Sequence, residues 1–170
     1  MRTHNGMRPL DVVVLMKIIA LSHENWQYRD LSASLHISIS EISESLNRSV
    51  IAGLLDSSKR KVKRLALMEF IQYGLHYVFP QLPGPVVRGM ETAHSHPFYR
   101  QHFSSNLPYV WPSPNGNARG QAIEPLHKGV VEAATQDQVL YKLLASIDIV
   151  RVGKVREIKL ALEELKKSIL

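Results

Sequence analysis

Cysteine is absent from all 170 residues of this sequence. Disulfide bonds, a thiolate nucleophile and a cysteine-ligated zinc site are therefore excluded. A long apolar run is missing as well, because the longest one, Val12 to Leu21, is interrupted by Lys17 and is far shorter than the ~20 apolar residues of a membrane helix. The first residues contain neither the apolar core nor the small-residue cleavage site of a signal peptide. We therefore expect a cytoplasmic protein with no membrane contact.

Motifs of common enzymes are also missing. The sequence has no G-x-x-x-x-G-K phosphate loop, no G-x-G-x-x-G dinucleotide loop and no serine in a nucleophile elbow. His94, His96 and His102, with Glu91 as the only candidate carboxylate, resemble a divalent-metal site weakly. We favour surface histidines in a flexible loop, and a metal-dependent enzyme is the remote alternative. The expectation is therefore a protein that is not an enzyme, with no metal and no cofactor.

Acidic residues are fewer than basic ones. Lys and Arg outnumber Asp and Glu by 21 to 15, which gives a formal net charge of +6 and a pI near 9.7. A polyanionic partner fits this balance, although charge by itself is weak support for nucleic-acid binding. Hydrophobic residues make up 45% of the chain, which is enough apolar material for the core of one domain, or of one domain with an extension.

Apolar residues at helical spacing predict most of the secondary structure. Pro9 suits the first turn of a helix that reaches Leu21 and is apolar on nearly all sides, so it should lie at the centre of the domain. Further helices are expected at 26–35, 38–54, 62–77, 138–150 and 154–170. The expected fold class is mainly α with small β hairpins (α+β), namely a winged helix-turn-helix core followed by C-terminal helices.

The middle of the chain differs in composition, because eight of the nine prolines lie between residues 77 and 126. Turn signals at Pro83-Gly84 and at Pro114-Asn115-Gly116 predict two hairpins. The first would join 77–79 to 85–88, and the second would join 109–111 to 119–123. We therefore divide the chain into a winged-helix core at 8–80, a Pro-rich hairpin and loop segment at 81–126 that acts as a wing or extension, and C-terminal helices at 127–170.

A helix-turn-helix unit is predicted around residues 34–38. Ser38 can cap the helix that follows, and Glu41 three residues later completes a capping box. Leu31 and Leu35 can pack on Ile42 and Leu46 to fix the crossing of the two helices. The second helix then presents a polar face to the major groove of DNA. The residues assigned to that face are Ser38, Ser40, Ser43, Glu44, Asn47 and Arg48.

The side chains of this face suit base reading. Asn can pair with adenine and Arg with guanine through two hydrogen bonds, and Ser hydroxyls can hold phosphates. Glu41 and Glu44 would repel phosphates, although a glutamate can accept from cytosine. The alternative is a three-helix core that mediates protein contacts, and the sequence leaves it open.

Two further groups of cations are candidates for DNA contacts. Lys59, Arg60, Lys61, Lys63 and Arg64 provide five positive charges directly after the expected reading helix, where a wing or a backbone-contacting loop would lie. A solvated connector is the alternative for this run.

Arg88 and Arg119 each lie near an expected hairpin turn. An arginine at a hairpin tip can enter a minor groove. The alternative is that each arginine binds carbonyls and braces the hairpins, and both interpretations remain open.

The last helix carries an apolar stripe at heptad-like spacing, formed by Val155, Ile158, Leu162, Leu165 and Ile169. Such a stripe can pack on its own domain or pair with a second chain. We expect a homodimer, because a two-fold pair of short reading helices can occupy two DNA half-sites.

Nearly the whole chain resembles a known protein family. The segment from Arg8 to Leu54 is similar to winged-helix regulators of the MarR-like superfamily. More closely, 77–80 (YVFP), 88–93 (RGMETA) and 111–120 (WPSPNGNARG) resemble a bacterial winged-helix group with YxFP…RGxxTA and WPxPxGxxRG segments. That group is described as DNA-binding or transcriptional regulators, some of them encoded beside toxin-like or nucleotidyltransferase genes.

The sequence therefore predicts a sequence-specific, double-stranded-DNA-binding transcriptional regulator. The alternative is a protein-interaction module that docks a partner, such as a toxin-like or nucleotidyltransferase enzyme encoded nearby.

Overall fold

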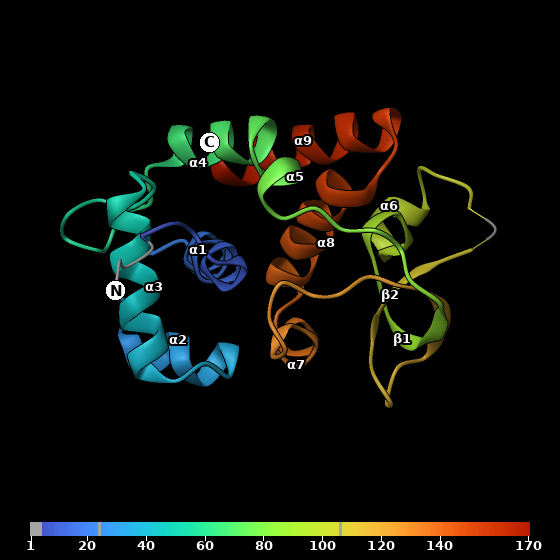
Figure 1. Cartoon of the computed structure of the whole chain (residues 1–170), viewed down its shortest axis with the longest axis horizontal. Helices are drawn as coiled ribbons and strands as arrows, with labels where there is room; N and C mark the ends of the chain where they lie inside the picture. Colours follow the sequence, from blue (N-terminus) through green and yellow to red (C-terminus); the bar gives the residue numbers. More distant parts are fainter. Residues whose placement is uncertain (1–4, 24, 106) are drawn as a thin grey trace.

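Helices fill one end and the middle of the molecule, and a small sheet lies at the other end of its long axis (Figure 1). The computed structural model describes residues 5–23, 25–105 and 107–170. The expected combination of helices with a small amount of β structure is confirmed. None of the helices in these ranges has both the length and the apolar character required to cross a bilayer.

Helix α1 (Pro9–Leu21) runs through the middle of the helical half. Pro9 occupies its first turn, and Asp11 accepts the backbone N–H of Arg8, so two features of the sequence fix where the helix begins. The five residues from Val12 to Met16 are all at most 1% exposed. The prediction of a helix that is buried on all sides is therefore confirmed.

Helices α2 (Tyr28–Leu35) and α3 (Ile39–Ile51) pack against each other and against α1. The Ser38 hydroxyl accepts the backbone N–H of Glu41 at 3.2 Å, so Ser38 caps α3 as predicted. The second bond of the expected capping box is replaced, because the Glu41 carboxylate accepts the Ser38 hydroxyl at 3.2 Å. Helix α3 ends at Ile51, three residues before the predicted end, and Gly53 continues the chain with a φ of 80°. Glycine adopts this left-handed conformation without strain.

Residues 54–63, which follow α3, fold into a short hairpin that we call the 54–63 hairpin. Leu55 and Val62 form an antiparallel bridge, and the backbone N–H of Lys63 donates to the carbonyl of Leu54 at 2.9 Å. The Asp56 carboxylate accepts the backbone N–H groups of Arg60 and Lys61, both at 3.0 Å. These bonds hold the turn in place.

Helices α4 (Arg64–Tyr73) and α5 (Leu75–Val78) replace the single helix that we predicted for 62–77. The break is at Gly74, which is the poorest helix former apart from proline. The first predicted hairpin is therefore wrong, because most of its first strand is helical. Pro80, Pro83 and Pro85 follow, and their missing N–H groups prevent a regular strand ladder before residue 86.

The strands β1 (Val86–Thr92), β2 (Tyr109–Pro112) and β3 (Ala118–Ala122) close into a small barrel. The second half of β1 pairs antiparallel with β2, and its first half pairs antiparallel with β3. The second predicted hairpin is therefore also wrong, because β2 and β3 run parallel to each other. Gly89 pairs with both neighbours, and a Cβ there would lie 2.1 Å from the carbonyl oxygen of Trp111.

A short 3-10 turn, η1 (Ala93–Ser95), and helix α6 (Pro97–Arg100) follow β1. We predicted a flexible loop with surface histidines here. Instead His94 and His96 are each 6% exposed, whereas His102 is exposed. Their rings pack edge-on against tyrosines, His94 against Tyr109 and His96 against Tyr141, so this segment is part of the folded interior.

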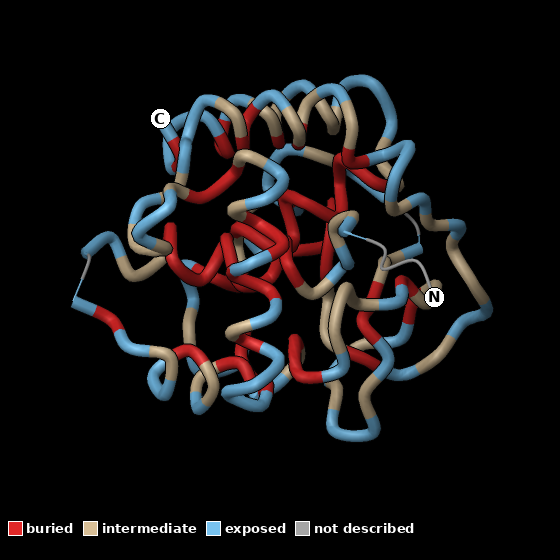
Figure 2. The backbone as a smooth tube through the Cα atoms, turned by 60° about the vertical axis from the view of Figure 1, so that its left-hand side comes forward, coloured by how far each residue is buried: buried red, intermediate tan, exposed pale blue. Residues whose placement is uncertain are grey.

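Three helices complete the chain, namely α7 (Val130–Gln136), α8 (Gln138–Val152) and α9 (Val155–Ile169). Helix α8 contacts α1, β1 and α9, and Figure 2 shows the buried segments gathered in the interior. Asp148 of α8 accepts hydrogen bonds from Thr92 at 2.8 Å and from the indole N–H of Trp111 at 2.7 Å. Arg151 pairs with Asp148 at 3.0 Å, so one buried carboxylate joins β1, β2 and α8.

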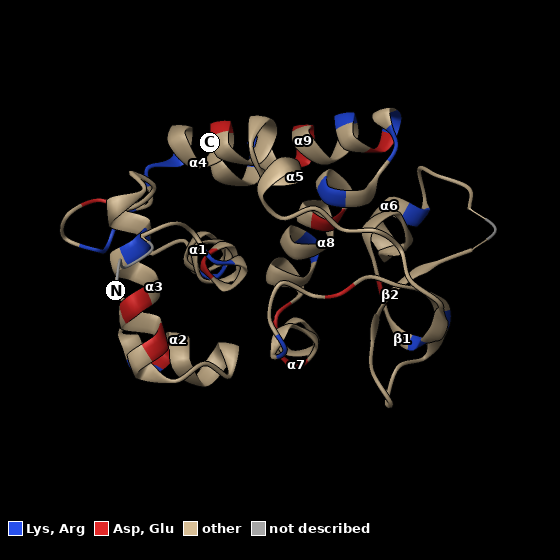
Figure 3. Cartoon of the chain, viewed as in Figure 1, with Lys and Arg blue, Asp and Glu red and all other residues tan. Residues whose placement is uncertain are grey.

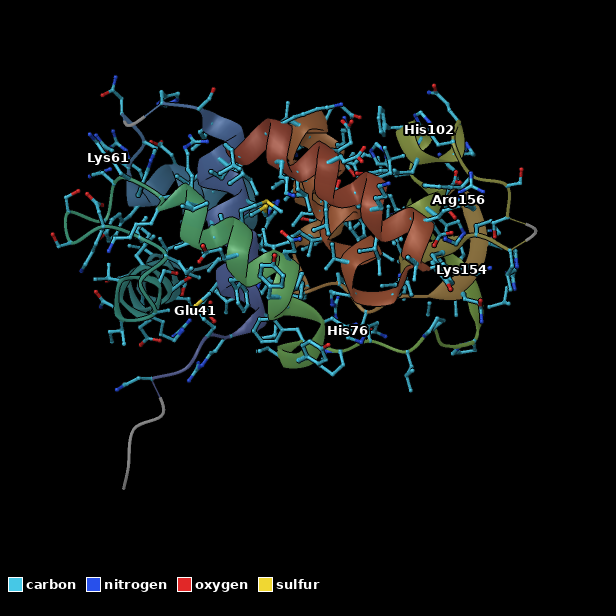
Figure 4. All side chains as sticks on the ribbon, turned by 90° about the horizontal axis from the view of Figure 1, so that it is seen from above. Glu41, Lys61, His76, His102, Lys154 and Arg156 are labelled. Atoms are coloured by element: carbon cyan, nitrogen blue, oxygen red, sulfur yellow. The ribbon has the colours of Figure 1, made fainter. Side chains whose placement is uncertain are left out.

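The apolar stripe of α9 is used within the chain. Figure 4 shows α9 lying alongside α4, and Leu165 and Ile169 are fully buried. Leu162 is half-buried, and only Val155, at 87% exposure, projects from the stripe. The stripe therefore closes the core of its own chain and does not offer a free dimer seam. The homodimer remains a prediction that no longer rests on α9.

Candidate nucleic-acid interface

The outer face of α3 forms one end of the molecule, opposite the β strands (Figure 1). Ile42 and Leu46 anchor the inner face of this helix in the core and are fully buried. Along the outer face, Ser40, Glu44 and Asn47 are exposed and Ser43 is half-buried. Ser38, the N-cap of α3, is exposed as well, so five of the six residues that the sequence assigned to the reading face are available to a partner.

Arg48 is an exception, and its assignment to the reading face needs correction. It is 9% exposed, and its guanidinium donates to both carboxylate oxygens of Asp11, at 2.9 and 2.8 Å. The pKa of Arg48 is raised, mainly by its hydrogen bond to Asp11. Because Asp11 is fully buried in α1, the pair fixes α3 on α1, and Arg48 has no guanidinium face to offer to a base.

The Asp11–Arg48 pair could have been anticipated from the composition of the first helix, although not from the spacing of its apolar residues. A carboxylate in an otherwise apolar helix must be paired when it is buried. Lys17, the other charge within α1, follows the same rule, since its ammonium lies 2.7 Å from the Asp137 carboxylate.

The 54–63 hairpin and the start of α4, which follow α3 in the chain, carry all five cations of the basic run. Figure 3 shows blue segments in the loop beside α3 and at the start of α4. Lys61, Lys63 and Arg64 are exposed, and Lys59 and Arg60 are half-buried.

Two of these cations are held by the fold. The guanidinium of Arg60 lies 4.6 Å from the ring centre of Trp26 and donates to the carbonyl of the same residue. Arg64 donates to the carbonyl of Ile169 at 2.8 Å. The hairpin is therefore fastened to the body of the protein through Arg60, and the start of α4 is fastened through Arg64.

Acidic and basic side chains occupy different parts of this end of the molecule. Glu41 and Glu44 lie on the first half of α3, and both are exposed, whereas the cations follow its last turn. Figure 4 shows Glu41 and Lys61 at this same end. A polyanion would therefore be attracted mainly to the hairpin, while α3 offers neutral and acidic side chains.

Arg88 and Arg119 belong to a different surface. They face each other in the register of β1 and β3, and both are exposed. The strands lie at the end of the long axis opposite α3 (Figure 1), so the fold does not bring these arginines to the α3 surface. Neither guanidinium makes a hydrogen bond or ion pair with any residue of the described ranges, so the bracing role that we considered for them is not seen.

The three histidines of the predicted loop differ in their surroundings. No group of three or more His, Asp or Glu side chains suited to a metal ion occurs in the described part of the chain. Burial lowers the pKa of His96 to about 4 and also lowers the pKa of His94. Glu91, the candidate carboxylate, instead pairs with Arg100 at 2.9 Å.

A cavity of about 760 Å³ lies between β1, the loop 112–118 and α7. Segments 88–93 and 111–120, which carry the resemblance, both contribute to its lining. Helix α7 also touches the turn between α2 and α3, because Glu132 lies 3.4 Å from the imidazole of His36. The cavity and the α3 surface are thus connected through one short helix.

No family model, curated protein or solved structure matches this chain. Any functional assignment therefore rests on its own residues and on the geometry just described.

Proposed function

We propose that this protein is a double-stranded-DNA-binding regulator that uses a winged helix-turn-helix. The order of elements supports the proposal. Three mutually packed helices, a turn at residues 36–38 and the 54–63 hairpin follow one another as they do in winged-helix proteins. The observation that carries the proposal is the hairpin itself, which follows α3 directly and carries Lys59, Lys61 and Lys63.

The two parts of this surface have different roles in the proposal. The hairpin lysines bind phosphates and supply affinity that does not depend on sequence. Ser40, Ser43 and Asn47 of α3 supply base contacts and phosphate contacts in the major groove. Glu44 accepts from a cytosine amino group, so it selects against other bases more than it adds affinity.

Replacing Lys59, Lys61 and Lys63 together by glutamine is expected to weaken binding to all duplexes alike. Each lost phosphate contact should make the plot of log affinity against log salt shallower by roughly 0.9. The measurement is a salt titration on one duplex of random sequence. The matched control replaces Lys154, Lys159 and Lys166, which are exposed on or just before α9. Equal slopes for the wild type and the hairpin variant would show that the hairpin is only a connector.

Asn47→Ala is expected to reduce discrimination between a specific and a random duplex by about 1–3 kcal/mol. Because Asn47 is exposed, the variant should unfold at the wild-type temperature. Competition binding with the DNA upstream of the protein's own gene measures the effect. Asn117→Ala, at an exposed loop position, is the control. Unchanged discrimination in Asn47→Ala would remove Asn47 from the reading face.

Protein docking is the second candidate function. It is favoured by large apolar side chains exposed on α4, on α5 and in the loop that follows, since Tyr73, Tyr77 and Leu82 are 70%, 81% and 86% exposed. Exposed aromatic residues are enriched in protein interfaces. A mainly apolar complex of this kind would keep its affinity as salt rises, whereas DNA binding would weaken steeply.

A further inference from the structure

A small basic cavity lies between the end of α1 and the base of the 54–63 hairpin. Its volume is about 210 Å³, and the polar residues among those described in its lining are Ser22, His23, Arg60, Lys61 and Arg64. None of the described residues that line it is acidic. Asp56 is the acidic residue of the hairpin, and its carboxylate accepts the backbone N–H groups of Arg60 and Lys61.

The two arginines of this cavity are held by neutral acceptors. Among the described residues, Arg60 and Arg64 bond to the backbone carbonyls of Trp26 and Ile169 and to no carboxylate. Two buried arginines, in contrast, have carboxylate partners, since Arg48 is paired with Asp11 and Arg151 with Asp148. Neutral acceptors thus fix Arg60 and Arg64 in place without neutralising them.

Each guanidinium retains donors for a ligand. An arginine has five N–H donors, and the described contacts use one on Arg60 and one on Arg64. Arg64 is also the first residue of α4, a helix of 10 residues. The partial positive charge of a helix N-terminus therefore adds to the field at this place.

We propose that this cavity binds a phosphate group. Arginine donors match the oxygens of a phosphate in pairs, the Ser22 hydroxyl adds a neutral donor, and the volume holds several water-sized groups. The group can come from free phosphate or a phosphomonoester, or from a phosphodiester of the DNA backbone. The first source needs no DNA, so it goes beyond the proposed function. The second rests on the proposed function and names one of its phosphate contacts.

The first arm of the test contains no DNA. Inorganic phosphate is titrated against the full chain and compared with chloride at the same ionic strength, and both calorimetry and the unfolding temperature are followed. A saturable heat and a rise in unfolding temperature with phosphate alone are expected when free phosphate is the source. Arg64→Gln should then weaken phosphate binding about tenfold. Arg119→Gln, which removes an exposed arginine at the other end of the molecule, should leave it unchanged.

The second arm uses duplex DNA. If a backbone phosphodiester is the source, inorganic phosphate will not bind, and Arg64→Gln will make the salt slope of DNA binding shallower by about 0.9, whereas Arg119→Gln will not. The proposal is overturned if phosphate binds equally to all variants, or if neither arm responds to Arg64→Gln. Loss of DNA binding by the wild type would end the proposed function but leave the first arm intact.

A second variant covers the case in which Arg64→Gln does not fold. Ser22 has a φ of 53°, a conformation in which glycine is unstrained. Ser22→Gly therefore removes the hydroxyl without disturbing the backbone. A weaker phosphate response in this variant supports the proposal. If Arg64→Gln is unfolded, an unchanged response of Ser22→Gly in both arms overturns it.

Discussion

Arg48→Ala is expected to lower the free energy of unfolding by about 3–5 kcal/mol, because it leaves the fully buried Asp11 carboxylate without its partner. Losses of this size are exceptional for single substitutions and take up much of the stability of a small domain. Urea denaturation followed by circular dichroism measures the loss directly. The effect should appear without DNA present, because the pair holds α3 against α1.

Two controls distinguish a structural role of Arg48, as the partner of Asp11, from a role in base reading. The double variant Asp11→Leu, Arg48→Met should recover much of the lost stability, since a buried ion pair can often be replaced by apolar residues at little cost. Asn47→Ala, one position earlier, should be as stable as the wild type. An Arg48→Ala protein with wild-type stability and impaired DNA binding would return Arg48 to the reading face.

Asp148→Ala is expected to be similarly damaging, at about 3–5 kcal/mol. The substitution removes the acceptor for Thr92 and Trp111. It also leaves the buried Arg151 without its carboxylate partner and, in the described part of the chain, with neutral acceptors only, which are oxygens of Phe79, Gln81 and Glu124. Burial raises the pKa of Asp148, and the positive charge of Arg151 opposes that shift. Arg151 therefore stabilises the charged form of the buried carboxylate, and Asp148 is the charged partner of Arg151 among the described residues.

Thermal unfolding and the near-ultraviolet signal of the tryptophans measure this second effect. Asp148→Asn keeps an acceptor oxygen but removes the charge, so its loss should fall between those of the wild type and the alanine variant. Glu124→Ala, at an exposed position, should behave as the wild type. Wild-type stability in Asp148→Ala would show that the contacts of β1 and β2 with α8 do not depend on this network.

Local chemistry was readable from the sequence in the N-terminal half. Pro9, the Ser38 cap and Gly53 act through bonds within a few residues of themselves, so their effects follow from spacing alone. The outer face of α3 was also predictable, because Ile42 and Leu46 fix which side of the helix is buried. The ion pair of Arg48 was missed because Arg48 lies at the edge of that face and its partner, Asp11, is 37 residues away.

Non-local pairing was not readable. The turn signal at Pro114-Asn115-Gly116 predicts a reversal of the chain, but which strands pair is decided by β1, more than 20 residues earlier in the chain. The result is a parallel β2–β3 pair in place of a hairpin. The packing partner of the α9 stripe could not be predicted either, because a dimer seam and a core helix have the same apolar spacing. Contact with α4 and α8 decides between them.

The central claim, that α3 and the 54–63 hairpin bind duplex DNA, is tested most directly by mapping backbone amide shifts during a titration with the duplex upstream of the protein's own gene. The account predicts that the largest shifts lie at Ser40, Ser43 and Asn47 and along the hairpin from Lys59 to Lys63, and that they fade as salt is raised. Largest shifts around Arg88 and Arg119 at the other end of the molecule, or no shifts at low salt with excess duplex, would contradict it.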